Sequence, residues 1–162
     1  MKNLLSMEHL SNEEIIHILN RAEEFENGSP TLLTKSYNVA NLFFEPSTRT
    51  KTSFEMAERK VGCTVIPFDA GFSSALKGET MYDTVKTLEM IGIDAVVIRA
   101  KEDEYYNELL EGIDAAVINA GDGAGQHPSQ SLLDLYTIKE EFGKFEGLKV
   151  TVVGDISHRR VA

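Results

Sequence analysis

Cysteine is nearly absent from this chain, and long apolar runs are absent altogether. Cys63 is the only thiol, so no disulfide can form within the 162 residues. It begins the apolar run CTVIPF, where a cysteine usually behaves as a small buried hydrophobe. No run approaches the roughly 18 apolar residues that a membrane helix needs, and no charged leader precedes an apolar stretch. We therefore expect a cytoplasmic protein that does not enter a membrane.

Motifs for common cofactors are also missing. There is no GxGxxG after the first predicted strand and no GxxxxGK[ST], which argues against a dinucleotide or a nucleoside triphosphate. No cysteine or second histidine lies at ligand spacing around His127, so no metal is expected. A nucleophile elbow is lacking, which leaves covalent catalysis without a candidate. We expect no cofactor.

Positive charge is scarce. Lysine and arginine total 16 against 26 aspartates and glutamates, giving a net charge of −10 that opposes nonspecific binding to nucleic acid. The acidic residues gather on predicted helices, as is typical of solvated faces. A small anion can still bind, because screening over about 8–10 Å lets a local basic cluster act independently of a distant acidic surface.

Apolar patterns predict an alternation of helices and strands in a chain long enough to bury a core. Ser11 and Glu14 have capping-box spacing and begin a helix that ends near Gly28. The order indicates an α/β fold with a parallel sheet and helices on both faces, in three αβα layers. The predicted elements are helix 11–26, strand 37–44, helix 48–61, strand 63–68, helix 79–91, strand 94–99, helix 103–111, strand 115–119, helix 129–142 and strand 148–153.

The segment FFEPSTRTKTSFEM at 43–56 is the most informative one. Pro46 ends a hydrophobic strand and Ser47 is a suitable N-cap for the helix that follows. The apolar positions expected to pack on the sheet recur at i, i+3 and i+7, at Phe54, Ala57 and Val61.

The first turn of this helix suits an oxyanion. It combines unpaired N–H groups, the positive end of the helix dipole, hydroxyls and a guanidinium, from Ser47, Thr48, Arg49 and Thr50. A capped surface helix whose Arg49 and Lys51 face water explains the same residues, so this segment alone leaves both interpretations open.

Polar residues follow other strands as well. In parallel sheets, ligands bind beyond the carboxyl ends of the strands. There the sequence places the irregular segment 69–78, Arg99 and the run NAGDGAGQHPSQ at 119–130, whose alternating glycines favour a flexible turn. Four segments are therefore expected to converge on one edge.

With these segments in place, the chain resembles the N-terminal half of an aspartate carbamoyltransferase catalytic chain over essentially all 162 residues. The motifs that carry the resemblance are STRT at 47–50 after FFEP, KGET at 77–80, VIR at 97–99, NAGDG at 119–123, HPSQ at 127–130 and GDI at 154–156 followed by HRRVA. Ornithine carbamoyltransferases share the first motif, but KGET and NAGDG fit the aspartate enzyme better. Two positions depart from the family pattern, Ala100 and Arg159.

The resemblance implies a role for each matching residue. The groups that hold the phosphate of carbamoyl phosphate are Ser47, Thr48, Arg49 and Thr50. Those that contact the carbamoyl group are Thr50, Arg99 and His127 at its oxygen and Gln130 at its nitrogen. Catalysis would rest on Arg49, Thr50, Arg99, His127 and Gln130. Substrate binding would also use Lys77 with Ser74, or alternatively Ser73, from a neighbouring subunit, and Arg160 for the aspartate carboxylate.

The resemblance further implies a carbamoyl-phosphate domain over residues 1–142, including an interdomain helix at 129–142. Residues 143–162 would begin an aspartate-binding α/β domain that is cut short. The full-length protein would carbamoylate L-aspartate as a homotrimer with shared active sites, with regulatory chains as candidate further partners. The 162 residues alone would bind carbamoyl phosphate at most. The alternatives are an ornithine-type or other carbamoyltransferase, or a non-catalytic, trimer-forming module that binds anions.

Overall fold

A parallel sheet of four strands, in the order β2-β1-β3-β4, forms the centre of the computed structural model. The structure describes residues 2–29, 33–69 and 78–153. Val39 of β1 lies opposite Ala95 of β3, which lies opposite Ala116 of β4, and the register between β3 and β4 shifts between Ile98 and Ala100. The strands are β1 (Asn38–Phe43), β2 (Thr64–Ile66), β3 (Ala95–Ala100) and β4 (Ala116–Asp122).

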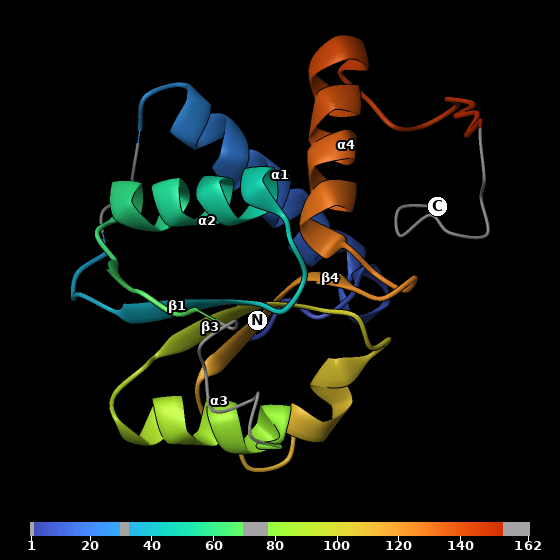
Figure 1. Cartoon of the computed structure of the whole chain (residues 1–162). Helices are drawn as coiled ribbons and strands as arrows, with labels where there is room; N and C mark the ends of the chain where they lie inside the picture. The colour runs from blue at the N-terminus through green and yellow to red at the C-terminus, as the bar shows by residue number, and fades with distance from the viewer. Residues whose placement is uncertain (1, 30–32, 70–77, 154–162) are drawn as a thin grey trace.

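Helices cover both faces of the sheet (Figure 1). One face carries α3 (Met81–Met90) and the 3-10 turn η4 (Tyr105–Leu109). The other face carries three longer helices: α1 (Asn12–Glu26), α2 (Thr48–Val61) and α4 (Pro128–Phe142). A 3-10 turn, η1 (Met7–His9), precedes α1. The predicted three-layer α/β fold is confirmed.

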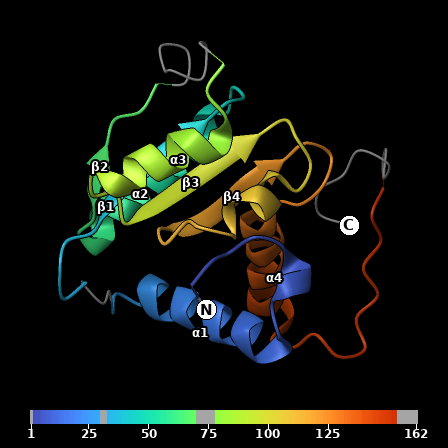
Figure 2. The same ribbon diagram turned by 90° about the horizontal axis from the view of Figure 1, so that it is seen from below.

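The main core lies between the sheet and the α3 face. Strand residues with no exposed surface, such as Leu42, Val96 and Ile98, pack there with Val85 of α3 and Leu109 of η4. Because both faces of the sheet are covered, the strands are near-continuous apolar runs rather than alternating ones. On the opposite face, α1 packs against α4 (Figure 2). Lys139 of α4 donates to Asn20 at 2.9 Å and to Glu23 at 2.7 Å.

The start of α1 is as predicted. The Ser11 hydroxyl accepts a hydrogen bond from the Glu14 amide at 3.2 Å, and the Glu14 carboxylate accepts from the Ser11 amide at 3.0 Å. This capping box satisfies two N–H groups that have no partner within the helix.

The packing face of α2 differs from the prediction. Ala57 is exposed, whereas Glu58 is buried, with 8% of its surface exposed. Its carboxylate accepts a hydrogen bond from the Nδ2 of Asn41, in the middle of β1, at 2.8 Å. The helix is rotated so that this polar pair, with Phe54 beside it, faces the sheet. An apolar period could not identify a packing face built partly on a buried hydrogen bond.

Three other predicted elements also differ. Residues 103–111 form the short 3-10 turn η4 rather than a longer helix. Strand β4 continues through Gly121 to Asp122, so the first part of the glycine-rich run is strand and not turn. Residues 148–153 form no strand, and Val150 and Val153 are 67% and 78% exposed. A single extended segment gains no stability without a neighbouring strand, and none pairs with it among the described residues.

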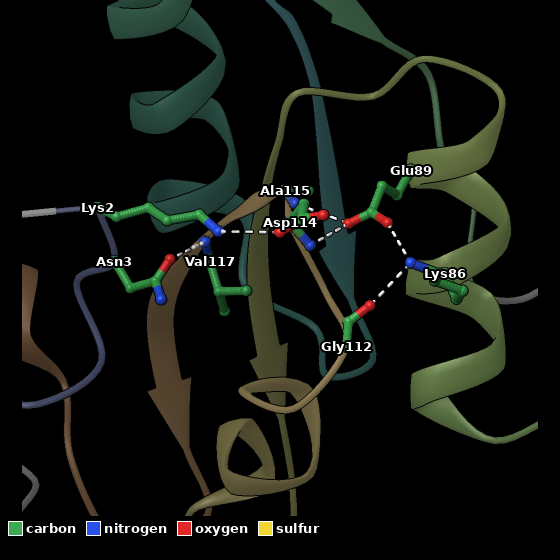
Figure 3. Close-up of polar contacts among 8 residues, drawn as sticks. All are labelled: Lys2, Asn3, Lys86, Glu89, Gly112, Asp114, Ala115 and Val117. Atoms are coloured by element: carbon green, nitrogen blue, oxygen red, sulfur yellow. Dashed lines mark hydrogen bonds and ion pairs between the residues drawn. The ribbon is translucent and has the colours of Figure 1, made fainter.

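The amino end of the sheet is held by a carboxylate clip, which we define as Glu89 with the backbone of residues 114–115 (Figure 3). The Glu89 carboxylate accepts from the amides of Asp114 and Ala115, the latter at 2.7 Å. Lys86 bridges the carboxylate to the Gly112 carbonyl, which lies 2.8 Å from its Nζ. The Lys86 hydrogen bond is the main reason that the pKa of Glu89 is lowered. Nearby, the Asn3 side chain accepts from the Val117 amide at 3.0 Å and Lys2 pairs with Asp114 at 3.9 Å.

Candidate active site

A cleft of about 790 Å³ lies where the carboxyl ends of β1, β3 and β4 meet. It collects seven of the residues that the sequence predicted for the site, from three separate segments. They are Ser47, Thr48, Arg49, Thr50, Arg99, His127 and Gln130. The predicted convergence is thereby confirmed for these segments. Ser73, Ser74, Lys77, Arg159 and Arg160 lie outside the described residues.

The N-terminus of α2 forms one wall of the cleft. The first intrahelical hydrogen bond runs from the Lys51 amide to the Ser47 carbonyl at 3.1 Å, so the amides of Thr48, Arg49 and Thr50 precede it. Ser47 occupies the predicted N-cap position, but its side chain makes no capping bond. The turn therefore presents amides, hydroxyls and the positive end of the dipole together.

Arg99 lines the cleft near the end of β3. Its side chain is 16% exposed, its Nε lies 3.3 Å from Glu45 Oε2, and its Nη1 donates to the Ala120 carbonyl at 3.2 Å. The pairing with Glu45 is an ion pair. These contacts fix the guanidinium at the cleft. Sequence reasoning missed Glu45, although Phe43 and Arg99 are register partners and Glu45 follows two residues later.

His127 and Gln130 come from the start of α4. His127 is the N-cap residue and Pro128, buried at the first helical position, is compatible with the helix because it needs no N–H partner there. The His127 Nδ1 lies 3.3 Å from the Ser129 hydroxyl. The side-chain NH₂ group of Gln130 donates to the Asp134 carboxylate at 2.9 Å. The side-chain amide oxygen of Gln130 can accept a hydrogen bond from an N–H donor.

Apolar and small residues complete the lining. Sequence reasoning did not assign Pro46, Ser53 or Leu133 to the site, although all three line the cleft. A smaller groove of about 280 Å³ continues between α2 and α4, and Ala57 lines it. This position explains why Ala57 is not part of the core. A helical period marks Ala57 as apolar but does not say which surface it covers.

A second cleft, of about 620 Å³, lies on the α3 side of the sheet. Its charged lining is one lysine and four glutamates: Lys101, Glu79, Glu102, Glu104 and Glu108. Such a surface repels anions, so the cleft at Arg49 and Arg99 is the one suited to a phosphate. In the described part of the chain, no group of three acidic, histidine or cysteine side chains is placed to hold a metal ion. Nor does any helix in those ranges have the length and apolar character needed to span a membrane.

Curated relatives match the whole of this chain. It is 55% identical, over 164 aligned residues, to the aspartate carbamoyltransferase catalytic subunit of Streptococcus sanguinis, covering 100% of this chain and 54% of the relative. The catalytic subunit from Listeria welshimeri is 56% identical over 162 residues, with 100% and 53% covered. The chain thus spans about half the length of the curated relatives it matches.

Solved structures agree. Aspartate transcarbamoylase from Trypanosoma cruzi, in complex with N-(phosphonacetyl)-L-aspartic acid, superposes with a TM-score of 0.88 at 34% identity, covering 99% of this chain and 51% of that one. The same enzyme in complex with carbamoyl phosphate and aspartate gives 0.87 at 35% identity, with 99% and 51% covered. The family described as aspartate/ornithine carbamoyltransferase, carbamoyl-P binding domain, matches residues 2–140. The chain therefore belongs to the aspartate/ornithine carbamoyltransferase family, through its carbamoyl-phosphate-binding domain.

Proposed function

We propose that the cleft binds carbamoyl phosphate, and that in a complete catalytic chain it transfers the carbamoyl group to the amino group of L-aspartate. The observation that carries this proposal is the meeting of the α2 N-terminus with Arg99, His127 and Gln130 in one cleft. A phosphate alone would need only the first of these. The additional donors and acceptors suit a carbonyl oxygen and an NH₂ group beside the phosphate.

The phosphate is assigned to the first turn of α2. Amides at a helix N-terminus and the guanidinium of Arg49 together provide several N–H donors for its oxygens. Negative charge on the phosphate increases as it leaves, so Arg49 and the helix dipole stabilise the transition state more than the substrate. We assign Lys77, with Ser74, to the same phosphate from a neighbouring subunit.

The carbonyl oxygen is assigned to Arg99, Thr50 and His127. Attack of the aspartate nitrogen on the carbamoyl carbon forms a C–N bond and moves an electron pair onto this oxygen. The electron pair on the oxygen then re-forms the C=O bond as the C–O bond to phosphate breaks. Phosphate departs with the electron pair of the broken bond, and the nitrogen loses a proton to the phosphate. Donors fixed before the reaction stabilise the oxyanion without reorganising, and the contacts of Arg99 with Glu45 and the Ala120 carbonyl provide such fixation. His127 acts here as a donor and not as a general base.

We further propose the domain division and assembly. Residues 1–142 form the carbamoyl-phosphate domain, with α4 as the interdomain helix, and residues 143–162 belong to the aspartate-binding domain, in which Arg160 would bind the aspartate carboxylate. Exposed apolar side chains on α4 support this role, since Leu133 is 58% and Phe142 62% exposed. The proposed assembly is a cytoplasmic homotrimer with shared sites, and regulatory chains are its candidate further partners.

Turnover with aspartate and with ornithine as acceptors, measured on the complete catalytic chain, tests the reaction. We expect carbamoyl aspartate and phosphate in equal amounts, and no comparable reaction with ornithine. Preference for ornithine would replace the aspartate assignment with an ornithine-type enzyme. Mixing inactive Arg49→Ala and Lys77→Ala chains tests the shared site, because a trimer that combines them regains some intact sites.

A non-catalytic module that binds anions is the second candidate, and the exposed N-terminus of α2 is the feature that favours it. Calorimetry on the 162-residue chain with phosphate, carbamoyl phosphate and a bisubstrate phosphonate separates the two. Preference for carbamoyl phosphate over phosphate supports the enzyme-derived site, since only the carbamoyl group engages Arg99, His127 and Gln130. Equal affinities would favour the simple anion site.

A further inference from the structure

We propose that Asp122 is a positioning residue for His127: its buried carboxylate holds the loop that presents His127 to the cleft. Asp122 ends β4 and has no exposed surface. Its Oδ2 accepts from the Glu104 amide at 2.8 Å, and its Oδ1 accepts from the Gln126 amide. Gln126 directly precedes His127. This inference rests on the proposed function for its consequence in ligand binding.

The loops after β3 and β4 are cross-linked in both directions. Asp122, at the end of β4, accepts from Glu104 in the β3 loop. Asp103, in the β3 loop, accepts in turn from the Ala124 amide at 2.7 Å. A third bond runs from the Gly123 amide to the Ala100 carbonyl at 3.1 Å. We call these three bonds and the Asp122–Gln126 bond the aspartate clip.

Main-chain hydrogen bonds connect the aspartate clip to His127 and Gln130. The Asp122 amide donates to the Gln126 carbonyl at 3.1 Å, and the Gly125 amide donates to the Asp122 carbonyl at 2.8 Å. On the far side, the Gln130 amide donates to the His127 carbonyl at 2.9 Å. The loop is thus closed on Asp122 immediately before His127, and α4 begins immediately after it. A shift of the loop would therefore move the side chains of His127 and Gln130 relative to Arg99.

The backbone around the clip is unusually constrained. Glu104 has a φ of +51° and is the one non-glycine residue with positive φ among residues 2–29, 33–69 and 78–153. Its main-chain amide is one of the two that donate to the Asp122 carboxylate. A Cβ added to Gly123, which has a φ of +36°, would lie 2.0 Å from Asp103 Oδ1 and 2.5 Å from the Lys101 carbonyl. Unfavourable backbone geometry persists only where surrounding contacts impose it, and here those contacts come from the clip.

A carboxylate is specifically required at residue 122. Each of its oxygens accepts from a different amide, Glu104 or Gln126. Asparagine has the same shape but must turn its NH₂ group toward one of these two N–H donors. No ion pair involving Asp122 occurs in the described part of the chain, and the partners of its two oxygens are main-chain amides. Asp122→Asn therefore perturbs the loop and little else.

The test compares Asp122→Asn with Glu89→Gln on this chain by calorimetry. Glu89 is a matched control, because its carboxylate also accepts two backbone amides but at the opposite end of the sheet (Figure 3). We expect Asp122→Asn to lower the preference for carbamoyl phosphate over inorganic phosphate about tenfold, as for one misplaced hydrogen-bonding group, while phosphate affinity stays unchanged. Glu89→Gln should leave the preference intact. An unchanged preference in Asp122→Asn, or equal weakening for both ligands, would overturn the proposal.

A readout without ligand separates this inference from the proposed function. The Cε1–H resonance of His127, assigned with a His127→Gln variant, should shift in Asp122→Asn and stay in place in Glu89→Gln. If the wild type does not prefer carbamoyl phosphate over phosphate, the proposed function fails. The His127 resonance then tests the role of Asp122 by itself, and a resonance that does not move in Asp122→Asn refutes that role. If Asp122→Asn does not fold, Asp103→Ala, which removes the acceptor of the exposed bond from the Ala124 amide, is held to the same two criteria.

Discussion

Replacing Glu58 by glutamine should stabilise the fold at neutral pH, although it alters a residue with a hydrogen-bond partner. Glu58 is 8% exposed and Asn41 2% exposed. One carboxylate oxygen accepts from Asn41 at 2.8 Å, whereas Glu58 Oε1 has no hydrogen-bond partner within the described residues. Burial is the main reason that the pKa of Glu58 is raised above its usual 4.5. The charge is therefore unfavourable in the folded state.

The expected gain follows from what glutamine retains. It keeps an oxygen for Asn41 Nδ2 and removes the buried charge. Its NH₂ group also replaces the unpaired Glu58 Oε1 with a donor for Asn41 Oδ1, which has no hydrogen-bond partner within the described residues. Leaving a buried polar atom unpaired costs about 1–3 kcal/mol. We expect Glu58→Gln to raise the free energy of unfolding at pH 7 by about 1–2 kcal/mol. For a domain of about 150 residues or more, each kcal/mol corresponds to about 2–4 °C in Tm.

The pH dependence of unfolding is a second test of whether Glu58→Gln is stabilising. Below pH 4.5 Glu58 is protonated in both the folded and unfolded states, so its burial penalty is absent. As pH rises through 4.5 and then through the raised folded pKa, the folded carboxylate becomes charged and the wild type loses stability. The difference between Glu58→Gln and wild type should thus be small at pH 4 and reach a plateau at higher pH.

Urea unfolding followed by circular dichroism at several pH values between 4 and 8 measures this difference. Glu111→Gln, at an exposed glutamate, is the control and should show no such change. A Glu58→Gln protein that is less stable than wild type at pH 7 would refute the reasoning. So would a difference that is the same at pH 4 and pH 8.

Three further predictions concern the site and its supports. Arg49→Ala in the complete catalytic chain should lower turnover by about 10²–10³, and near-normal turnover would contradict its role at the phosphate. Gly123→Ala should weaken carbamoyl phosphate binding measured by calorimetry, because the new Cβ would lie 2.0 Å from Asp103 Oδ1; unchanged affinity would show that the loop adapts. Glu89→Gln should destabilise the protein at neutral pH, and the loss should shrink as pH falls below 4.5. The pKa of Glu89 is lowered in the folded state, so the wild type itself loses this stabilisation when Glu89 is protonated. Urea midpoints at pH 7 and pH 3 measure the two losses, and equal losses would contradict the prediction.

Much of the fold follows from local patterns. The capping box at Ser11 and the buried strands β1, β3 and β4 lie where the sequence patterns placed them. The site was accessible for a topological reason, since parallel strands bring the segments that follow them to one edge of the sheet. Arg99 and His127 are 28 residues apart in sequence, yet both line the cleft.

The features that were missed depend on partners distant in sequence. Glu58 faces the sheet because Asn41 offers a hydrogen bond there, and Glu45 lies at the site because β3 brings Arg99 beside it. The sequence predicted that Asp122 belongs to a glycine-rich turn. Its bond to the Glu104 amide could not be foreseen, because Glu104 lies in another loop. The absence of a strand at 148–153 has the same origin, because a strand requires a neighbour as well as an apolar sequence.

Amide chemical-shift mapping of the chain during titration with carbamoyl phosphate tests the central claim most directly. Saturable shifts should concentrate on residues 47–50, on Arg99 and on 127–130, the three segments that form the cleft at the carboxyl edge. Inorganic phosphate should move residues 47–50 but leave Arg99 and Gln130 nearly unchanged. Shifts centred on the acidic cleft around Glu79 and Glu108, or identical patterns for both ligands, would contradict the assignment of this site.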